Sequence, residues 1–139
     1  MSRQREIRFK NLCDAARSLE AAVAQGSTSL AAAEFAALKA QLAAQRLTTR
    51  VDPLLVETVA DFTDDPAEAI QLYKEAISLS DAASCPTYTQ RIWMAARLLE
   101  LGNRVEARRQ LIRAKPEAER LEHASAVSYS ESLLQQLPV

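Results

Sequence analysis

Few of the residues on which catalytic and metal sites depend occur in this chain. It holds one histidine, His123, and two cysteines, Cys13 and Cys85, among 139 residues. A histidine pair, a histidine–cysteine dyad or a multi-histidine metal site therefore cannot be built within one chain. The two glycines are 76 positions apart, so there is no glycine-rich phosphate loop. We therefore expect a protein that is not an enzyme and that binds no metal or cofactor.

Aromatic residues are also scarce, at 5%, and runs of strand-forming residues are absent. Alanine, leucine, arginine and glutamate dominate instead, which is typical of an all-helical protein. With 139 residues the chain is long enough to bury a core without disulfides. We expect residues 1–139 to form a single all-α domain.

Long apolar runs are missing as well. No stretch approaches the roughly 18 consecutive apolar residues of a membrane helix. Residues 1–10 lack the apolar core of a signal peptide. The sequence therefore predicts a cytoplasmic protein with no membrane partner.

The net charge is only −1, but the charges are unevenly distributed. Residues 1–50 carry eight basic and four acidic groups, residues 51–86 one and eight, and residues 87–139 eight and six. Such segregation steers a charged partner or serves only solubility. Because the pI is near 5.9 and no aromatic residues are interleaved with the arginines, we expect no nucleic-acid partner.

Helical periodicity and termination signals predict a pair of N-terminal helices within residues 5–50. The first, over residues 6–25, has one apolar stripe made of Phe9, Leu12, Cys13, Ala16, Leu19 and Val23. Gly26 is well placed to end it. The second, rich in alanine, is expected to begin at a serine or threonine cap in residues 27–29 and to run to about Leu47.

Two aspartate–proline pairs mark further helix starts. Asp52-Pro53 and Asp65-Pro66 each place a capping carboxylate before a proline at the first helical position, where the missing N–H costs nothing. The remaining pattern predicts four helices, over residues 53–62, 66–80, 87–101 and 104–114.

The C-terminal segment, residues 116–137, is expected to form one more helix. Pro116 starts or kinks it, and its apolar positions are Ala118, Leu121, Leu134 and Leu137. A helix of this kind would cover the apolar end of a helical stack.

A pattern of small and large residues is written twice, 38 residues apart. Glu68-Ala69 is followed by Tyr73 and Ala76, and Glu106-Ala107 is followed by Leu111 and Ala114. The pattern resembles the tetratricopeptide repeat family, whose helix-turn-helix unit repeats about every 34 residues. The resemblance covers residues 53–115 and implies two stacked antiparallel hairpins within about seven helices.

The family's concave groove is lined by the first helix of each repeat. The matching positions here are Leu54, Thr58, Asp61, Thr89, Ile92, Ala96 and Leu99. Family members that clamp a terminal carboxylate use lysine, arginine and asparagine there, whereas the first-repeat positions here carry leucine and threonine. The resemblance thus implies an apolar groove for a protein segment, unless the N-terminal helices fill it.

Three functions fit such a module. The first is an adaptor or secretion-type chaperone that binds a protein segment in the groove. The second is an immunity- or antitoxin-type inhibitor that binds a toxin through a charged surface, for which Arg97, Arg104 and Arg108 are candidates. The third is a structural subunit that forms a homo-oligomer. For Trp93, the only tryptophan, the sequence favours a place in the core over a place at an interface.

Overall fold

The computed structural model describes residues 3–137, without the side chains of residues 4–6, 8 and 9. The described chain is all-helical and contains no strand, as the composition predicts. Its seven helices are α1 (Arg3–Ala24), α2 (Thr28–Arg46), α3 (Pro53–Asp61), α4 (Pro66–Ala82), α5 (Tyr88–Glu100), α6 (Arg104–Arg120) and α7 (Ala124–Gln135). None of these helices is both long enough and apolar enough to cross a membrane.

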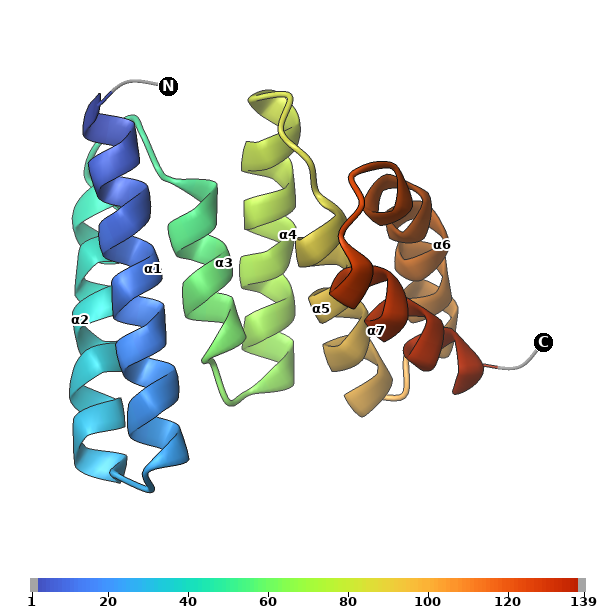
Figure 1. Ribbon diagram of the computed structural model, residues 1–139, viewed down its shortest axis with the longest axis horizontal. Helices are drawn as coiled ribbons and strands as arrows, with labels where there is room; N and C mark the ends of the chain where they lie inside the picture. Colours follow the sequence, from blue (N-terminus) through green and yellow to red (C-terminus); the bar gives the residue numbers. More distant parts are fainter. Residues whose placement is uncertain (1–2, 138–139) are drawn as a thin grey trace.

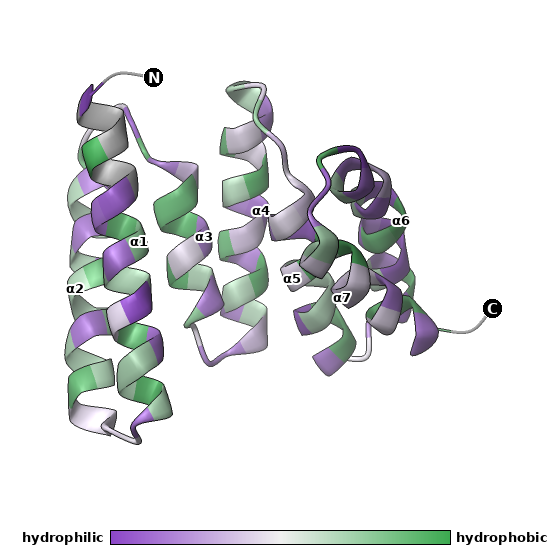
Figure 2. Ribbon diagram, viewed as in Figure 1, coloured by the Kyte–Doolittle hydropathy of each residue, from purple (hydrophilic) through white to green (hydrophobic). Residues whose placement is uncertain are grey.

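The helices follow one another along the long axis of the molecule (Figure 1). Each packs chiefly against the next in the sequence, and α5 also contacts α7. Hydrophobic and hydrophilic residues are both present along each helix (Figure 2), as in amphipathic helices. The chain thus runs from the α1–α2 pair at one end of the molecule to α6 and α7 at the other.

Both predicted aspartate caps are confirmed. The Asp52 carboxylate accepts a hydrogen bond from the N–H of Leu54 at 2.9 Å, and the Asp65 carboxylate accepts one from the N–H of Glu68 at 3.2 Å. Each cap precedes a proline at the start of its helix. These short signals fix where α3 and α4 begin.

Two adjoining clusters form the core. The first joins α1 and α2 to α3 and α4 through Leu12, Leu19, Leu38, Leu42, Leu55, Val56, Val59 and Ala76. The second contains residues from all five helices from α3 through α7, including Ile70, Tyr73, Met94, Leu98, Leu111 and Leu133. Val23, predicted in the stripe of the first helix, is 60% exposed, and Ala22 is buried in its place. The side chain of Phe9, also predicted there, lies outside the described residues.

The alanines of the repeated pattern lie where helices approach most closely. Ala69, Ala76 and Ala107 are fully buried, and Ala114 is 1% exposed. A larger side chain has no free volume there, and overpacking costs about 1–3 kcal/mol. The repeated pattern therefore reports close helix packing.

The C-terminal prediction is wrong in its boundaries. Helix α6 continues through Pro116 to Arg120, and the break falls at residues 121–123 instead. Ala114 and Ala118 are both buried one turn apart, so helical continuation buries both and offsets the hydrogen bond that Pro116 cannot donate. The segment predicted as one helix is therefore divided between the end of α6 and all of α7.

The break is made by a left-handed residue. Glu122 has φ 56°, and the N–H of His123 donates to the carbonyl of Ala118 at 3.0 Å while that of Glu122 donates to Glu119 at 3.1 Å. This Schellman arrangement also ends α5, where Gly102 takes the left-handed position at φ 76°. At Glu122 a residue with a Cβ adopts a conformation that favours glycine.

Replacing Glu122 with glycine should therefore stabilise the protein. The left-handed strain of a residue with a Cβ, about 1–2 kcal/mol, exceeds the extra unfolded-state entropy of glycine, so we expect a gain of about 0.5 kcal/mol in the free energy of unfolding. Urea denaturation measures it. Glu119→Gly, inside α6, is the matched control and should cost about 1 kcal/mol. A loss of stability in Glu122→Gly would contradict the assignment.

Candidate functional site

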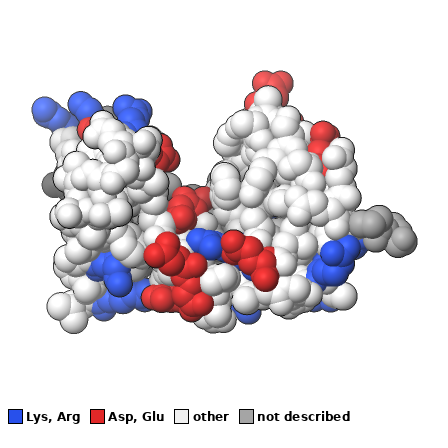
Figure 3. Space-filling view, turned by 90° about the horizontal axis from the view of Figure 1, so that it is seen from below, with Lys and Arg blue, Asp and Glu red and all other residues white. Residues whose placement is uncertain are grey.

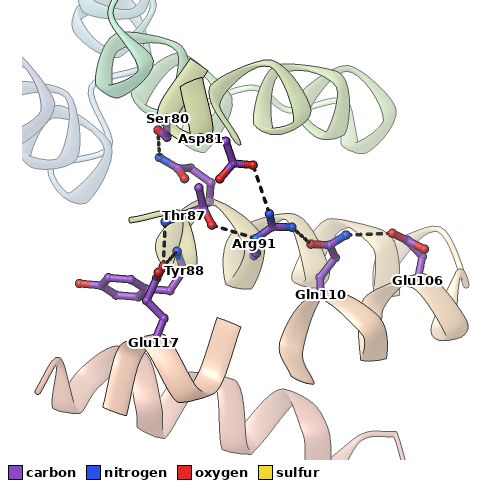
Figure 4. Close-up of polar contacts among 9 residues, drawn as sticks. Ser80, Asp81, Thr87, Tyr88, Arg91, Glu106, Gln110 and Glu117 are labelled. Carbon is purple, nitrogen blue, oxygen red and sulfur yellow. Dashed lines mark hydrogen bonds and ion pairs between the residues drawn. The ribbon is translucent and has the colours of Figure 1, made fainter. Parts of the chain in front are cut away.

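Helix α5 is held in place by polar contacts from its neighbours (Figure 4). The Glu117 carboxylate of α6 accepts hydrogen bonds from the N–H groups of Thr87 and Tyr88, at 2.8 and 3.0 Å. These N–H groups belong to the start of α5 and have no helical partner of their own. A side chain from a different helix thus caps α5 and fixes its starting point against α6.

Arg91 adds a second restraint on the same helix. Its guanidinium donates to the Thr87 hydroxyl at 2.9 Å and to the Gln110 side chain at 2.8 Å, and it lies 3.7 Å from the Asp81 carboxylate (Figure 4). Loss of water contact, together with the charge of nearby Arg113, lowers the pKa of Arg91. The side chain connects the end of α4 to α6 through α5, so the rotation of α5 is fixed.

The fixed rotation leaves one face of α5 open, and two cavities lie along it. The first, of about 380 Å³, is named here the polar cavity. It is lined by Glu20 of α1, Asp61 and Phe62 at the end of α3, Tyr73 of α4, Trp93, Ala96, Arg97 and Glu100 of α5, and Tyr129 of α7. In the space-filling view the molecule is hollowed between its N-terminal and C-terminal parts, and acidic side chains gather beside the hollow (Figure 3).

The second cavity, of about 260 Å³, is named the apolar cavity. It lies between α5 and α7 and is lined by Thr89, Ile92, Trp93, His123, Ser125, Ala126 and Tyr129. Trp93 and Tyr129 line both cavities, and their rings pack with centroids 4.6 Å apart. The aromatic pair therefore borders both cavities. The two adjoining cavities are together named the groove.

Trp93 is not in the core, contrary to the prediction from the sequence. It is 45% exposed, while Met94 and Ala95 beside it are almost completely buried. Positions 89, 93, 96 and 100 share one face of a helix, and that face of α5 borders the groove. The prediction relied on the size and apolar character of Trp93. In the structure its position on the helix places the side chain at the surface.

Asp61 has unusual electrostatics. Its carboxylate accepts a hydrogen bond from the Tyr73 hydroxyl. Loss of water contact raises the pKa of Asp61 to about 7; the charges of Glu57 and Glu20 act in the same direction, and the Tyr73 hydrogen bond and Arg97 act against it. Asp61 as a whole residue is nevertheless exposed, so screening by water reduces the free energy that accompanies this pKa shift.

Among the described residues, Arg97 is the only basic one that lines the polar cavity. Its guanidinium donates to the backbone carbonyls of Thr63 and Asp64, in the turn between α3 and α4, and to the Glu100 carboxylate at 3.0 Å. These contacts tie α5 to that turn. They also leave Glu20 and Asp61 without an ion pair to any described lysine or arginine side chain.

The structure brings four of the seven predicted groove residues to the groove. They are Asp61 and Ala96 at the polar cavity and Thr89 and Ile92 at the apolar cavity.

The other three lie elsewhere. Leu54 packs against the N-terminal core cluster, and Thr58 is buried with its hydroxyl donating to the Leu54 carbonyl at 2.7 Å. Leu99 packs against the C-terminal cluster. The first-repeat part of the predicted groove is thus largely taken up by internal packing, in which α1 and α2 take part.

The three predicted arginines do not form one surface. Arg97 lies in the groove, as described above. Arg104 donates to the carbonyl of Gln136 at 3.0 Å, and Arg108 donates to that of Leu137. Both side chains thus bind carbonyls at the end of α7, where the helix dipole favours positive charge.

Several groove residues were not predicted from the sequence. Glu20, Phe62, Tyr73 and Tyr129 come from four different segments, and only folding brings them together. Glu100 had a signal, because it lies seven residues after Trp93 on the same face of α5.

No metal site is evident in the described residues, where no group of three or more histidine, cysteine, aspartate or glutamate side chains is placed to hold an ion. No protein-family model matches the chain, and neither a curated protein nor a solved structure matches it. The function is therefore inferred from the geometry and chemistry of the groove.

Replacing Asp61 with asparagine should raise the midpoint of thermal unfolding, by an amount that grows with pH. A carboxyl with a pKa raised in the folded protein stabilises the fold while protonated and loses that contribution as pH rises through the folded pKa, here about 7. We expect little gain near pH 4 and the full gain above about pH 7. Differential scanning calorimetry across this range measures it.

Asp64→Asn is the matched control for this measurement, because Asp64 lies in the adjacent turn and does not line the polar cavity. It should show no comparable growth of the gain with pH. An equal gain for Asp61→Asn at every pH would mean that the raised pKa is not the cause.

Proposed function

We propose that the chain is a non-catalytic protein-interaction module that holds a segment of another protein in the groove. In this role it is a small adaptor or chaperone. The observation that carries the proposal is the exposed Trp93, which packs on Tyr129 between two adjoining cavities. Large aromatic side chains at cavity walls are common among the residues that dominate binding energy.

The order of the helices supports a stack of the tetratricopeptide type. In that arrangement α3–α4 and α5–α6 are the two repeats, and α7 covers the end. The groove residues come mainly from α3, α5 and α7, with Glu20 from α1 and Tyr73 from α4, so most of them lie on or at the end of alternate helices. A groove lined by alternate helices is what such a stack presents to a peptide.

The charged-surface alternative, an inhibitor of a toxin, has less support. Arg104 and Arg108 already bind carbonyls at the end of α7, and Arg97 binds the turn before α4. Self-assembly has a specific observation in its favour, since Val105 and Ile112 of α6 are 72% and 58% exposed. Light scattering over a wide concentration range decides this case, because a monomer at every concentration excludes it.

Trp93→Ala tests the groove against Ile112→Ala as its matched control. Both changes remove an exposed large apolar side chain, but only Trp93 lines the groove. A groove partner, captured from native lysate with the wild-type protein and then purified, should bind Trp93→Ala at least about tenfold more weakly and Ile112→Ala with unchanged affinity. Titration calorimetry measures both affinities. Equal affinity for Trp93→Ala and the wild type would overturn the proposal.

A further inference from the structure

The polar cavity has an excess of negative charge. Glu20, Asp61 and Glu100 line it against one cation, Arg97. Glu100 is paired with Arg97 at 3.0 Å, and Arg97 also binds two backbone carbonyls. Above about pH 7, where Asp61 is ionised, two carboxylates therefore remain to be balanced by a ligand, and an anionic group entering the cavity would be repelled.

The walls of this cavity also favour a cation. Phe62, Tyr73, Trp93 and Tyr129 contribute aromatic rings. A lysine or arginine head group over the face of such a ring is attracted by its negative charge density, most strongly where water is excluded. Carboxylates and aromatic rings thus converge on the same ligand chemistry.

The apolar cavity accepts a different group. Trp93, Ala126 and Tyr129 keep exposed surface, and the lining between α5 and α7 is largely hydrophobic. His123 at its edge is already held by the Tyr88 hydroxyl, 2.9 Å from Nδ1. Because Trp93 and Tyr129 separate this cavity from the polar one, a single extended segment can reach both.

We propose that the groove recognises a bipartite segment of a partner protein: a lysine or arginine side chain enters the polar cavity beside Asp61 and Glu20, and a nearby apolar side chain enters the apolar cavity. This inference rests on the proposed function and specifies its ligand. The apolar side chain supplies contact area against Trp93 and Tyr129, which both keep exposed surface. The basic side chain supplies selection, because a neutral or acidic residue would leave the two carboxylates unbalanced.

Trp93 is the only tryptophan in the chain and lines both cavities, so its fluorescence reports on the groove directly. The probes are hexapeptide mixtures, acetylated and amidated, in which one position is always leucine and another is fixed as arginine, lysine, citrulline or glutamate. Citrulline has nearly the shape of arginine without its charge. We expect the arginine and lysine mixtures to shift the emission at concentrations at least about fivefold lower than the citrulline and glutamate mixtures.

The double variant Glu20→Gln, Asp61→Asn should abolish this preference while the peptides still bind through leucine. Glu68→Gln is the matched control, an exposed carboxylate on α4 that does not line the groove. It should keep the preference. The preference should also weaken below about pH 6, where Asp61 is protonated.

A second measurement needs no variant. In the wild-type protein, caesium ions should quench Trp93 more strongly than iodide ions do, relative to the same ions acting on N-acetyltryptophanamide. Equal or reversed quenching would overturn the negative character of the groove.

The outcomes separate this inference from the proposed function. Equal binding of the arginine and citrulline mixtures, still lost in Trp93→Ala, would overturn the cation site and leave the groove as a peptide-binding site. Emission that no mixture changes, together with a captured partner whose affinity Trp93→Ala does not alter, would overturn both.

Discussion

The arrangement of the groove depends on the close packing of α5 between α4 and α6. Ala69 of α4, Ala95 of α5 and Ala107 of α6 have no exposed surface and belong to one core cluster. Such contacts leave no volume for adjustment, because protein interiors are packed as densely as organic crystals. Two sides of α5 are thus occupied, and the side with Trp93 is the one left to border the groove.

Polar contacts make this packing specific. The buried alanines limit how far apart the helices lie, and the polar contacts fix the rotation of α5, because Glu117 meets two particular N–H groups and Arg91 meets Gln110. Rotation would leave the buried Arg91 guanidinium without its partners, which costs several kcal/mol. The same contacts that close α5 against α6 therefore aim Trp93 and Arg97 into the groove.

Local chemistry explains which parts of the fold could be predicted. Asp52 and Asp65 act through N–H groups two or three residues away, and Gly26 and Gly102 take left-handed positions that favour glycine, so these four helix ends are legible in the sequence. The end of α6 uses the same left-handed geometry at Glu122, a residue type that gives no such signal. Pro116, a strong local signal, misplaced that boundary because burial of Ala114 and Ala118 outweighs the missing hydrogen bond.

Only part of the groove could be predicted from the sequence, for a related reason. Thr89, Ile92 and Ala96 were predicted from the resemblance to the repeat family, but the opposite wall comes from α1, α3, α4 and α7, whose approach no local pattern encodes. Charge shows this most clearly. From the sequence Arg97 belongs with Arg104 and Arg108 on a basic surface, yet the carbonyls of Thr63 and Asp64 draw it into the turn between α3 and α4. Among the described residues that line the polar cavity, Arg97 is the only cation, and it is held by that turn and by Glu100. The remaining carboxylates of the cavity therefore give the groove its negative charge.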